Sequence, residues 1–402
     1  MGLGLIRLGI PSAPFFDEVH YVPAARVLLD LSHVTNQEHP LLGKAIIAAG
    51  ISLFGDNPMG WRIFPLLAGA IALFAFMRAL WFASERRFAT IAGGILLATA
   101  FPLFVQSRIA MLDIFMVCFV MVALWMCAAA VREPESARWR LAIAGIALGC
   151  AMASKWNAVP VAMVPGLAFL FLRMRVAGLG FLTARRGAPV PGMSLAEAGV
   201  WLGLVPLVTY VLTFLPAFFY ESDPLTIGSF VEYHRVMIER QSGLTTPHPY
   251  QSTWTQWMLN LRAIWYLYEE ADGAMRGVLL VGNPLTMLAG LVGLAWCLWS
   301  GIWRKNRAAL AVVVLYVVSM ALWVTAAKPI QFYYHYVLPS CFLVAALALA
   351  LDDLWQKGWR KSSVGPVLAC CALFAWFYPI LSAAALDDPQ DFLYWAWIEG
   401  WR

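Results

Sequence analysis

The feature that most constrains this chain is a series of long apolar runs separated by short, basic connections. A helix needs about 20 apolar residues to cross the hydrocarbon core of a bilayer, and its backbone groups are satisfied within the segment. The composition, 61% hydrophobic and 13% charged, is that of an integral membrane protein. The runs predict ten spanning helices, at 61–83, 88–106, 114–131, 141–154, 156–172, 195–218, 277–303, 308–327, 337–354 and 363–386.

The connections between these runs differ in charge, and the difference predicts their side of the membrane. Alternate connections are rich in Lys and Arg, such as "SERR" at 84–87 and "WRKNR" at 303–307. Short basic loops stay in the cytoplasm, so the other connections, which hold all six histidines, are expected to face outward. The net charge of +5 is spread over short loops, which argues against nucleic-acid binding. We expect a multi-pass protein in the lipid bilayer of the plasma (inner) membrane, working on its extracytoplasmic side.

Under this topology the chain divides into an N-terminal segment, two outward loops, two sets of transmembrane helices and a tail. The N-terminal segment, 1–14, is too short to span, so we expect a residual or truncated first transmembrane segment, with a re-entrant or interfacial helix as the alternative. Both loops are expected to carry interfacial helices, including one at 226–240, and the first loop to be catalytic. The expected boundaries are 15–60 and 218–276 for the loops, 61–217 and 277–386 for the transmembrane sets, and 387–402 for the tail.

Two adjacent acids, Asp17 and Glu18 in "PFFDEVHY", lie at the expected outer edge of the membrane. A solvated helix start accounts for one acid, because carboxylates favour the first turn of a helix. Ionisable residues at membrane depth, however, usually mark a working site, and the same face carries the cations Arg62, Arg108 and Lys155. We therefore interpret the pair as part of a functional site.

This combination of side chains favours transfer from a phosphate-linked donor. A carboxylate can act as general base toward a hydroxyl, and clustered cations neutralise a departing phosphate. The sequence has no P-loop and no Gly-rich nucleotide-binding turn. A lipid-linked sugar phosphate is thus the expected donor, and a one-step displacement with a single base would invert the anomeric centre.

Five motifs in order, "FFDEVHY", "EHPLLGK", "GDNPMGWR", "RIAMLDIF" and "ASKWNA", resemble those of the protein O-mannosyltransferases and their bacterial relatives, members of the GT-C glycosyltransferases. The resemblance is strongest from 14 to 158, with weaker matches at "HPYQSTWTQW" and "KPIQFYYHYVLP". It implies an all-α polytopic membrane protein, a GT-C type transmembrane helix bundle with interfacial helices in the outward loops. It also implies transfer of a sugar, mannose by resemblance alone, from a polyprenyl-phosphate donor to a Ser/Thr hydroxyl of a protein, and possible dimers.

The resemblance assigns roles to individual residues of this sequence. Asp17 is implied to be the catalytic base, Glu18 to shape the same site, and Arg62 to be functionally sensitive, while Arg108 or Lys155 is expected to hold the donor phosphate. "HPLLGK" has Leu41 where the family has a second proline. The residues expected to bind substrate are Glu18, His39, Lys44, Arg62, Arg108, Asp113, Lys155, Lys328 and Tyr334. For His39, Lys44, Lys328 and Tyr334, snorkelling cations and interfacial aromatics are the alternative.

Several alternatives remain open from the sequence. Eukaryotic members carry a β-trefoil-type module that 218–276 has no room for, so we expect a bacterial-type member, with a lipid A or cell-envelope glycan as the alternative acceptor. A divalent metal is possible, although no two histidines stand at i, i+4 spacing. A solute transporter is a distant alternative. Transporters place ionisable residues near the bilayer midplane, whereas those of this sequence cluster at one face of the membrane.

Overall fold

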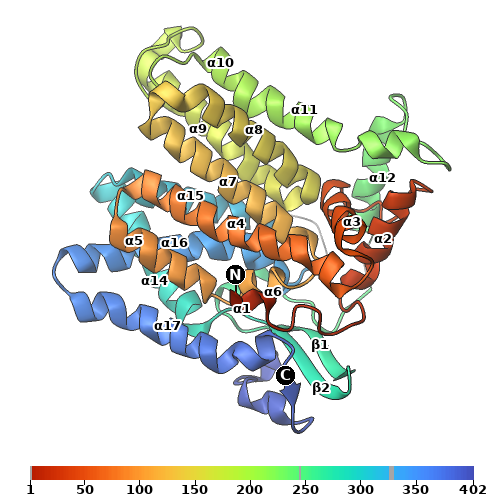
Figure 1. The fold of residues 1–402 in the computed structure, drawn as a ribbon. Helices are drawn as coiled ribbons and strands as arrows, with labels where there is room; N and C mark the ends of the chain where they lie inside the picture. The colour runs from red at the N-terminus through yellow and green to blue at the C-terminus, as the bar shows by residue number, and fades with distance from the viewer. Residues whose placement is uncertain (1, 244–245, 326–329) are drawn as a thin grey trace.

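The protein, described here by a computed structural model for residues 2–243, 246–325 and 330–402, is a bundle of long helices with a small sheet at one corner (Figure 1). The first half contains α1 (Gly2–Leu5), α2 (Glu18–Asp30), α3 (Leu42–Phe54), α4 (Pro58–Ser84), α5 (Arg87–Ala98), α6 (Pro102–Gln106), α7 (Leu112–Arg132), α8 (Ala137–Ser154) and α9 (Val159–Ala177). The second half contains α10 (Leu195–Gly199), α11 (Val205–Leu212), α12 (Phe230–Ser242), α13 (Trp254–Met258), α14 (Pro284–Trp303), α15 (Arg307–Thr325), α16 (Val337–Gln356) and α17 (Arg360–Leu381).

In the described part of the chain, eight helical segments are long and apolar enough to span a membrane. They coincide with eight of the ten predicted spans, which confirms a multi-pass helical membrane protein. The predicted span 88–106 is instead broken into α5 and α6, because Pro102 opens a new helix after Phe101 adopts a φ of 75°. The predicted span 141–154 lies in α8, which is 18 residues long and carries Arg138 in its first turn.

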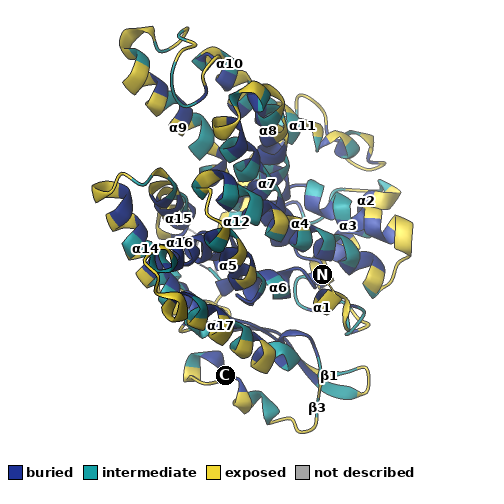
Figure 2. Cartoon of the chain, turned by 60° about the vertical axis from the view of Figure 1, so that its left-hand side comes forward, coloured by how far each residue is buried: buried dark blue, intermediate teal, exposed yellow. Residues whose placement is uncertain are grey.

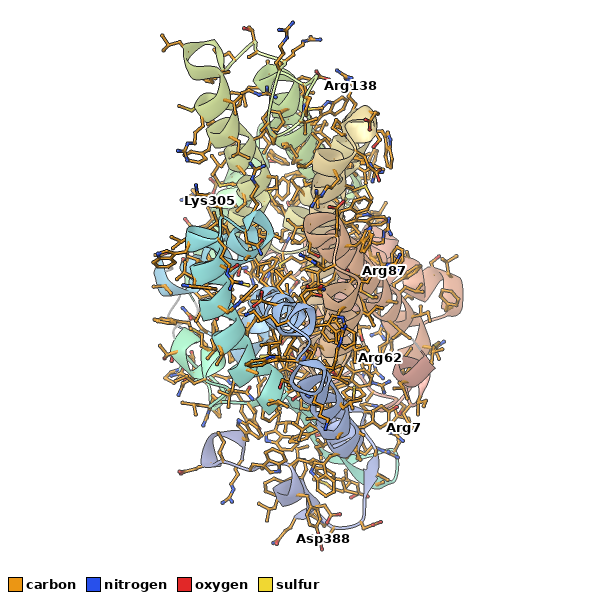
Figure 3. The ribbon with its side chains drawn as sticks, turned by 90° about the vertical axis from the view of Figure 1, so that its left-hand side faces the viewer. Arg7, Arg62, Arg87, Arg138, Lys305 and Asp388 are labelled. Carbon is orange, nitrogen blue, oxygen red and sulfur yellow. The ribbon has the colours of Figure 1, made fainter. Side chains whose placement is uncertain are left out.

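The connections gather at two opposite ends of the bundle. The basic connections, such as those before α5 and α15, lie at the left in Figure 1, while α2, α3, α12 and the hairpin lie at the right. Figure 3 looks onto the basic end and labels Arg87, Arg138 and Lys305 there. This separation agrees with the charge pattern of the loops, and the end formed by α2, α3, α12 and the hairpin is called the α2–α3 end below.

The core lies along α7 and α16, which occupy the middle of the bundle (Figure 2). In the spanning window that contains α16, 83% of the residues are buried, against 22% for the window that contains α9. The close approach of α8 to α11 depends on Gly149, where an added Cβ would lie 2.6 Å from the Pro206 carbonyl oxygen. Small residues at helix interfaces allow this approach in membranes.

The two long connections at the α2–α3 end pack against each other. Their backbones pair where Glu221 N donates to the Leu31 carbonyl at 2.8 Å. The Gln37 side chain donates to the Tyr233 carbonyl at 3.3 Å, and Gln241 Nε2 donates to the Glu38 carbonyl at 2.6 Å. Because these bonds join residues about 200 positions apart in the chain, α12 is fixed onto the loop between α2 and α3. We call this set of contacts the loop bridge.

A β-hairpin follows α13, formed by β1 (Ile264–Ala271) and β2 (Ala274–Leu280), with β3 (Ala385–Leu386) pairing antiparallel to β2. The prediction that a spanning helix begins at 277 was therefore wrong at its start, since α14 begins at Pro284. The turn is Asp272-Gly273, with φ values of 48° and 72°. Both residues have positive φ, as a two-residue hairpin turn requires, and Asp-Gly is a strong sequence signal for one.

Candidate active site

Glu18 and Arg62 form a fully buried ion pair at the start of α2. The Arg62 guanidinium donates to both Glu18 carboxylate oxygens, at 2.8 and 2.7 Å, and to the carbonyls of Leu8 and Pro11, at 3.0 and 2.7 Å. Ala110 N donates to the same carboxylate at 2.9 Å. The pair therefore ties the N-terminal segment, α4 and the turn before α7 together, and neither side chain is exposed to reach a substrate. The pair with these partners is called the Glu18–Arg62 tie.

Arg108 makes a similar set of bonds a short way along the chain. Its guanidinium donates to the Gly4 carbonyl, to the Arg7 carbonyl at 3.2 Å and to the Ser382 carbonyl at 3.5 Å. Its carbon also lies 5.4 Å from the Phe104 ring centroid. The structure thus places Arg108 on backbone carbonyls of the N-terminal segment and the end of α17, and it does not bring this cation to Asp17.

Asp17 points the other way from its neighbour. It occupies the N-cap position of α2, yet its carboxylate caps no backbone N–H. The Tyr21 hydroxyl donates to Asp17 Oδ2 at 3.4 Å. Burial raises the pKa of the Asp17 carboxyl above its usual range, the positive charge of Lys155 opposes this, and the negative charge of Asp113 adds to it. Asp17 is therefore a half-buried carboxylate whose charge interacts with Lys155 and Asp113.

Lys155 and Asp113 form a second buried ion pair, with Lys155 Nζ 2.6 Å from Asp113 Oδ2. Asp113 lies in the first turn of α7, and Lys155 follows the last residue of α8. Among the residues that the structure describes, Asp113 Oδ1 has no hydrogen-bond partner although it is buried. Two carboxylates, Asp17 and Asp113, thus share one cation, and this group is called the acid–lysine cluster.

Aromatic rings border the acid–lysine cluster. Lys155 Nζ lies 4.8 Å from the Tyr334 ring centroid, an attractive cation–π geometry. Phe16, next to Asp17, stacks on Tyr266 with ring centroids 4.0 Å apart and meets the Tyr334 ring edge-on at 6.1 Å. Phe16 has a φ of 51°, which is strained for a bulky residue, so these ring contacts help to hold the backbone that aims Asp17.

His39 and Lys44 lie beside the loop bridge, and their contacts hold the connection between α2 and α3. Lys44 Nζ donates to the carbonyls of Asn36 and His39 at 2.7 and 2.9 Å, and burial lowers the pKa of Lys44 to about 7. His39 Nδ1 lies 3.2 Å from Gln241 Nε2. These contacts leave the buried Lys44 cation facing backbone carbonyls instead of the acid–lysine cluster. The predicted site residue Lys328 lies outside the described residues.

Four residues near the cluster were missed by the sequence analysis as site residues: Phe16, Tyr21, Gln106 and Tyr266. Phe16 and Tyr21 flank the acids within a motif already identified, so their proximity to the acids was the available signal. Tyr266 lies on β1, and the Asp-Gly turn after that strand was the signal that could have found it. Gln106 ends α6 within a run interpreted as a single spanning helix.

For metal binding, the described residues contain no group of three or more His, Cys, Asp or Glu side chains placed to hold an ion. The two acids of the cluster are accompanied by a lysine, whose positive charge repels a cation. We therefore assign no residue to a metal.

Comparison with family models matches two regions of the chain. Residues 38–182 match the model for dolichyl-phosphate-mannose-protein mannosyltransferase, and residues 226–401 match the model for the C-terminal four-transmembrane region of protein O-mannosyltransferase. The polyprenol-phosphate-mannose–protein mannosyltransferase of Mycolicibacterium smegmatis is 28% identical, covering 99% of this chain and 90% of the relative. That of Mycobacterium tuberculosis is 26% identical, covering 100% and 89%.

Among solved structures, the fold is similar to the Saccharomyces cerevisiae protein O-mannosyltransferase Pmt1–Pmt2 complex bound to the sugar donor, with a TM-score of 0.84 at 15% identity, covering 100% of this chain and 91% of that one. It is also similar to ArnT from Cupriavidus metallidurans bound to undecaprenyl phosphate, with a TM-score of 0.61 at 16% identity, covering 94% and 63%. These matches confirm the GT-C type of bundle. The five motifs, the two family models and relatives aligned over nearly the whole chain agree, and the chain belongs to the protein O-mannosyltransferase family of GT-C membrane glycosyltransferases.

Proposed function

We propose that this chain transfers mannose, with inversion, from a polyprenyl-phosphate donor to a Ser or Thr hydroxyl of a protein. Family membership and the names of its relatives support this reaction. The observation that carries it is the acid–lysine cluster, in which the half-buried carboxylate of Asp17 faces a buried Lys155–Asp113 pair. One carboxylate can take a proton there while one cation accepts a phosphate.

The reaction is a single displacement at the anomeric carbon. The acceptor oxygen forms a bond to C1 as the bond from C1 to the phosphate oxygen breaks, and the electron pair leaves with the polyprenyl phosphate. Asp17 takes the proton of the acceptor hydroxyl. Because burial raises the pKa of this carboxyl, Asp17 is a stronger base than an ordinary aspartate.

Lys155 is the cation assigned to the leaving phosphate. Its Nζ is held by Asp113 at 2.6 Å and has one aromatic face, Tyr334, beside it. A positive charge fixed where negative charge develops stabilises the transition state more than the ground state. In this scheme Asp113 positions Lys155, and the Glu18–Arg62 tie positions Asp17 by fixing the start of α2.

We place this active site on the extracytoplasmic side of the plasma membrane, because the basic connections gather at the opposite end of the bundle. Cysteines introduced at exposed positions, in a chain whose seven native cysteines have been replaced, test the orientation. A membrane-impermeant maleimide on intact cells is expected to label Ser222→Cys and to leave Lys305→Cys unlabelled. The resemblance also suggests a dimer, which chemical cross-linking in membranes would detect as a band of twice the mass.

Transfer of labelled mannose from polyprenyl phosphate mannose to a Ser/Thr-rich peptide tests the reaction. Membranes with the wild-type chain are expected to transfer, and Asp17→Asn is expected to reduce transfer by about 100-fold or more while still binding donor. Undiminished transfer by Asp17→Asn would contradict the assigned base. Donor binding without transfer to any peptide, together with transfer to a lipid A or envelope glycan, would replace the protein acceptor with a glycan one.

A further inference from the structure

Tyr266 is the extra residue of a β-bulge in β1. In the register of β1 with β2, Trp265 pairs with Leu279 and Leu267 pairs with Val278, so Tyr266 has no partner position opposite it. A bulge re-aims the side chain of the unpaired residue and is common beside active sites. Here the re-aimed ring stacks on Phe16, the residue before the assigned base. The bulge therefore places a tyrosine of the hairpin against the reaction site.

Gln106, at the end of α6, completes a hydrogen-bonded pair with this tyrosine. Its Nε2 donates to the Tyr266 hydroxyl oxygen at 2.7 Å, and both side chains are buried, at 0% and 4% exposed. Among the described residues, Gln106 Oε1 has no hydrogen-bond partner. A buried amide oxygen without a partner is unfavourable, so its retention needs an explanation.

The unused hydrogen-bonding capacity of this pair does not depend on how the amide is oriented. In the observed orientation, and counting only partners in the described ranges, Gln106 Oε1 is a free acceptor and the Tyr266 hydroxyl proton is a free donor. If the amide is turned over, Oε1 accepts from Tyr266, which leaves Nε2 as a free donor and the phenol oxygen as an acceptor. In either orientation at least one donor and one acceptor remain side by side. This is the complement of an alcohol hydroxyl.

The charge around the pair selects a neutral ligand. Burial and the negative charges of Asp113 and Asp17 raise the pKa of Tyr266 well above its ordinary value, so its hydroxyl keeps its proton. Neither Gln106 nor Tyr266 carries the positive charge that a phosphate needs, and the cation assigned to the phosphate is Lys155. A buried polar pair beside aromatic rings and an anionic cluster is suited to a sugar hydroxyl.

Resting on the proposed function, we infer that Gln106 and Tyr266 bind one hydroxyl of the donor hexose and thereby help to select the sugar. Neither residue takes part in proton transfer. A site built to hydrogen-bond a hydroxyl discriminates strongly against a donor that lacks it, because its own buried groups then stay unpaired.

Singly deoxygenated mannosyl polyprenyl phosphates test the inference, with kcat/KM for transfer as the readout. Wild type is expected to have a lower kcat/KM for each deoxy donor that lacks a hydroxyl bound by the enzyme. Tyr266→Phe keeps the ring stack, and Gln106→Leu removes the unpaired amide, so both variants should fold. Each is expected to lower kcat/KM for the complete donor by about tenfold. In wild type, each such deoxy donor lowers kcat/KM relative to the complete donor. For one deoxy donor, this decrease should be absent from both variants, while the decreases for the other deoxy donors remain.

Tyr268→Phe is the matched control, since Tyr268 lies on the same strand but donates to the Pro389 carbonyl and is half-exposed. Tyr268→Phe is expected to show the same decrease in kcat/KM as wild type for every deoxy donor. A loss in Tyr266→Phe and Gln106→Leu that is equal for all donors, or the wild-type decreases in both, would overturn the inference and leave a packing role. Absence of wild-type transfer from the complete donor would instead overturn the proposed function, and the sugar contact with it.

Discussion

Asp17 and Glu18 are adjacent in the chain, yet they enter opposite kinds of environment. Glu18 belongs to a tie in which one carboxylate meets one guanidinium and the remaining donors meet backbone carbonyls. Asp17 belongs to a cluster in which two carboxylates share one lysine, and one buried Asp113 oxygen has no partner among the described residues. Removing one partner of a satisfied buried ion pair is strongly destabilising, whereas a buried cluster with unmet bonds is a candidate for ligand binding.

The first way to break this comparison is to remove the cation of the tie. Arg62→Ala leaves the Glu18 carboxylate buried without its partner, so we expect a loss of about 3–5 kcal/mol in unfolding free energy. Thermal unfolding in detergent measures it, with Arg62→Lys as a control that keeps the charge but loses the two-pronged contact. A melting temperature of Arg62→Ala equal to that of wild type would show that the tie is not structural.

The second way removes the cation of the acid–lysine cluster. Lys155→Met is expected to reduce transfer by about 100-fold, because the leaving phosphate loses its fixed positive charge. It also leaves Asp113 unpaired, so some stability should be lost. The double variant Asp113→Asn/Lys155→Met is expected to regain stability without regaining transfer. Recovery of transfer by the double variant would contradict the role given to Lys155.

The pH dependence of transfer sharpens the comparison. Asp17 acts as a base only when deprotonated, and its pKa is raised from the ordinary value of 3.8, so kcat/KM should fall with decreasing pH at values above 3.8. Lys155→Met removes the positive charge that lowers this pKa, so the acid limb of the profile should move to higher pH. A limb that stays in place in Lys155→Met would assign it to another group.

The smallest expected effect concerns the hydroxyl beside the base. Tyr21 donates to Asp17 at 3.4 Å, a long hydrogen bond that favours the ionised carboxylate. Tyr21→Phe should therefore move the acid limb slightly upward and change transfer at neutral pH by about threefold or less. A loss as large as that of Asp17→Asn would mean that the hydroxyl, and not the carboxylate alone, handles the proton.

The sequence predicted the parts of this molecule that depend on local chemistry. Apolar length located eight spans, and the adjacency of Asp17 and Glu18 pointed to the site, because these signals lie in contiguous residues. The sequence could not predict that Glu18 forms a buried ion pair while Asp17 joins the acid–lysine cluster, since the partner of Glu18 lies 44 positions away in the chain. The partners of Arg108 could not be predicted for the same reason, since they belong to the N-terminal segment and to the residue after α17.

The hairpin was missed for a different physical reason. The residues of β2, "AMRGVLL", are separated from the apolar helix α14 by only three residues, 281–283, so hydropathy alone joins strand and helix into one run. The Asp272-Gly273 turn marks the hairpin, and the N-cap Asn283 followed by Pro284 marks the start of the helix. Without the hairpin, neither the bulge at Tyr266 nor its contact with Gln106 could be anticipated, because both depend on strand register.

The loop bridge has a consequence for exchanging parts between relatives. Because Gln37, Glu38 and Leu31 of one loop are bonded to Tyr233, Gln241 and Glu221 of the other, neither loop presents its surface independently. A chimaera that receives only 218–276 from a relative would keep the backbone groups of Glu221 and Tyr233, but it would lose the bond to the Glu38 carbonyl wherever the relative replaces Gln241. We expect a chimaera to take over the acceptor preference of a relative only when both loops come from that relative. The residues that determine acceptor preference would then lie in two separate segments of the sequence.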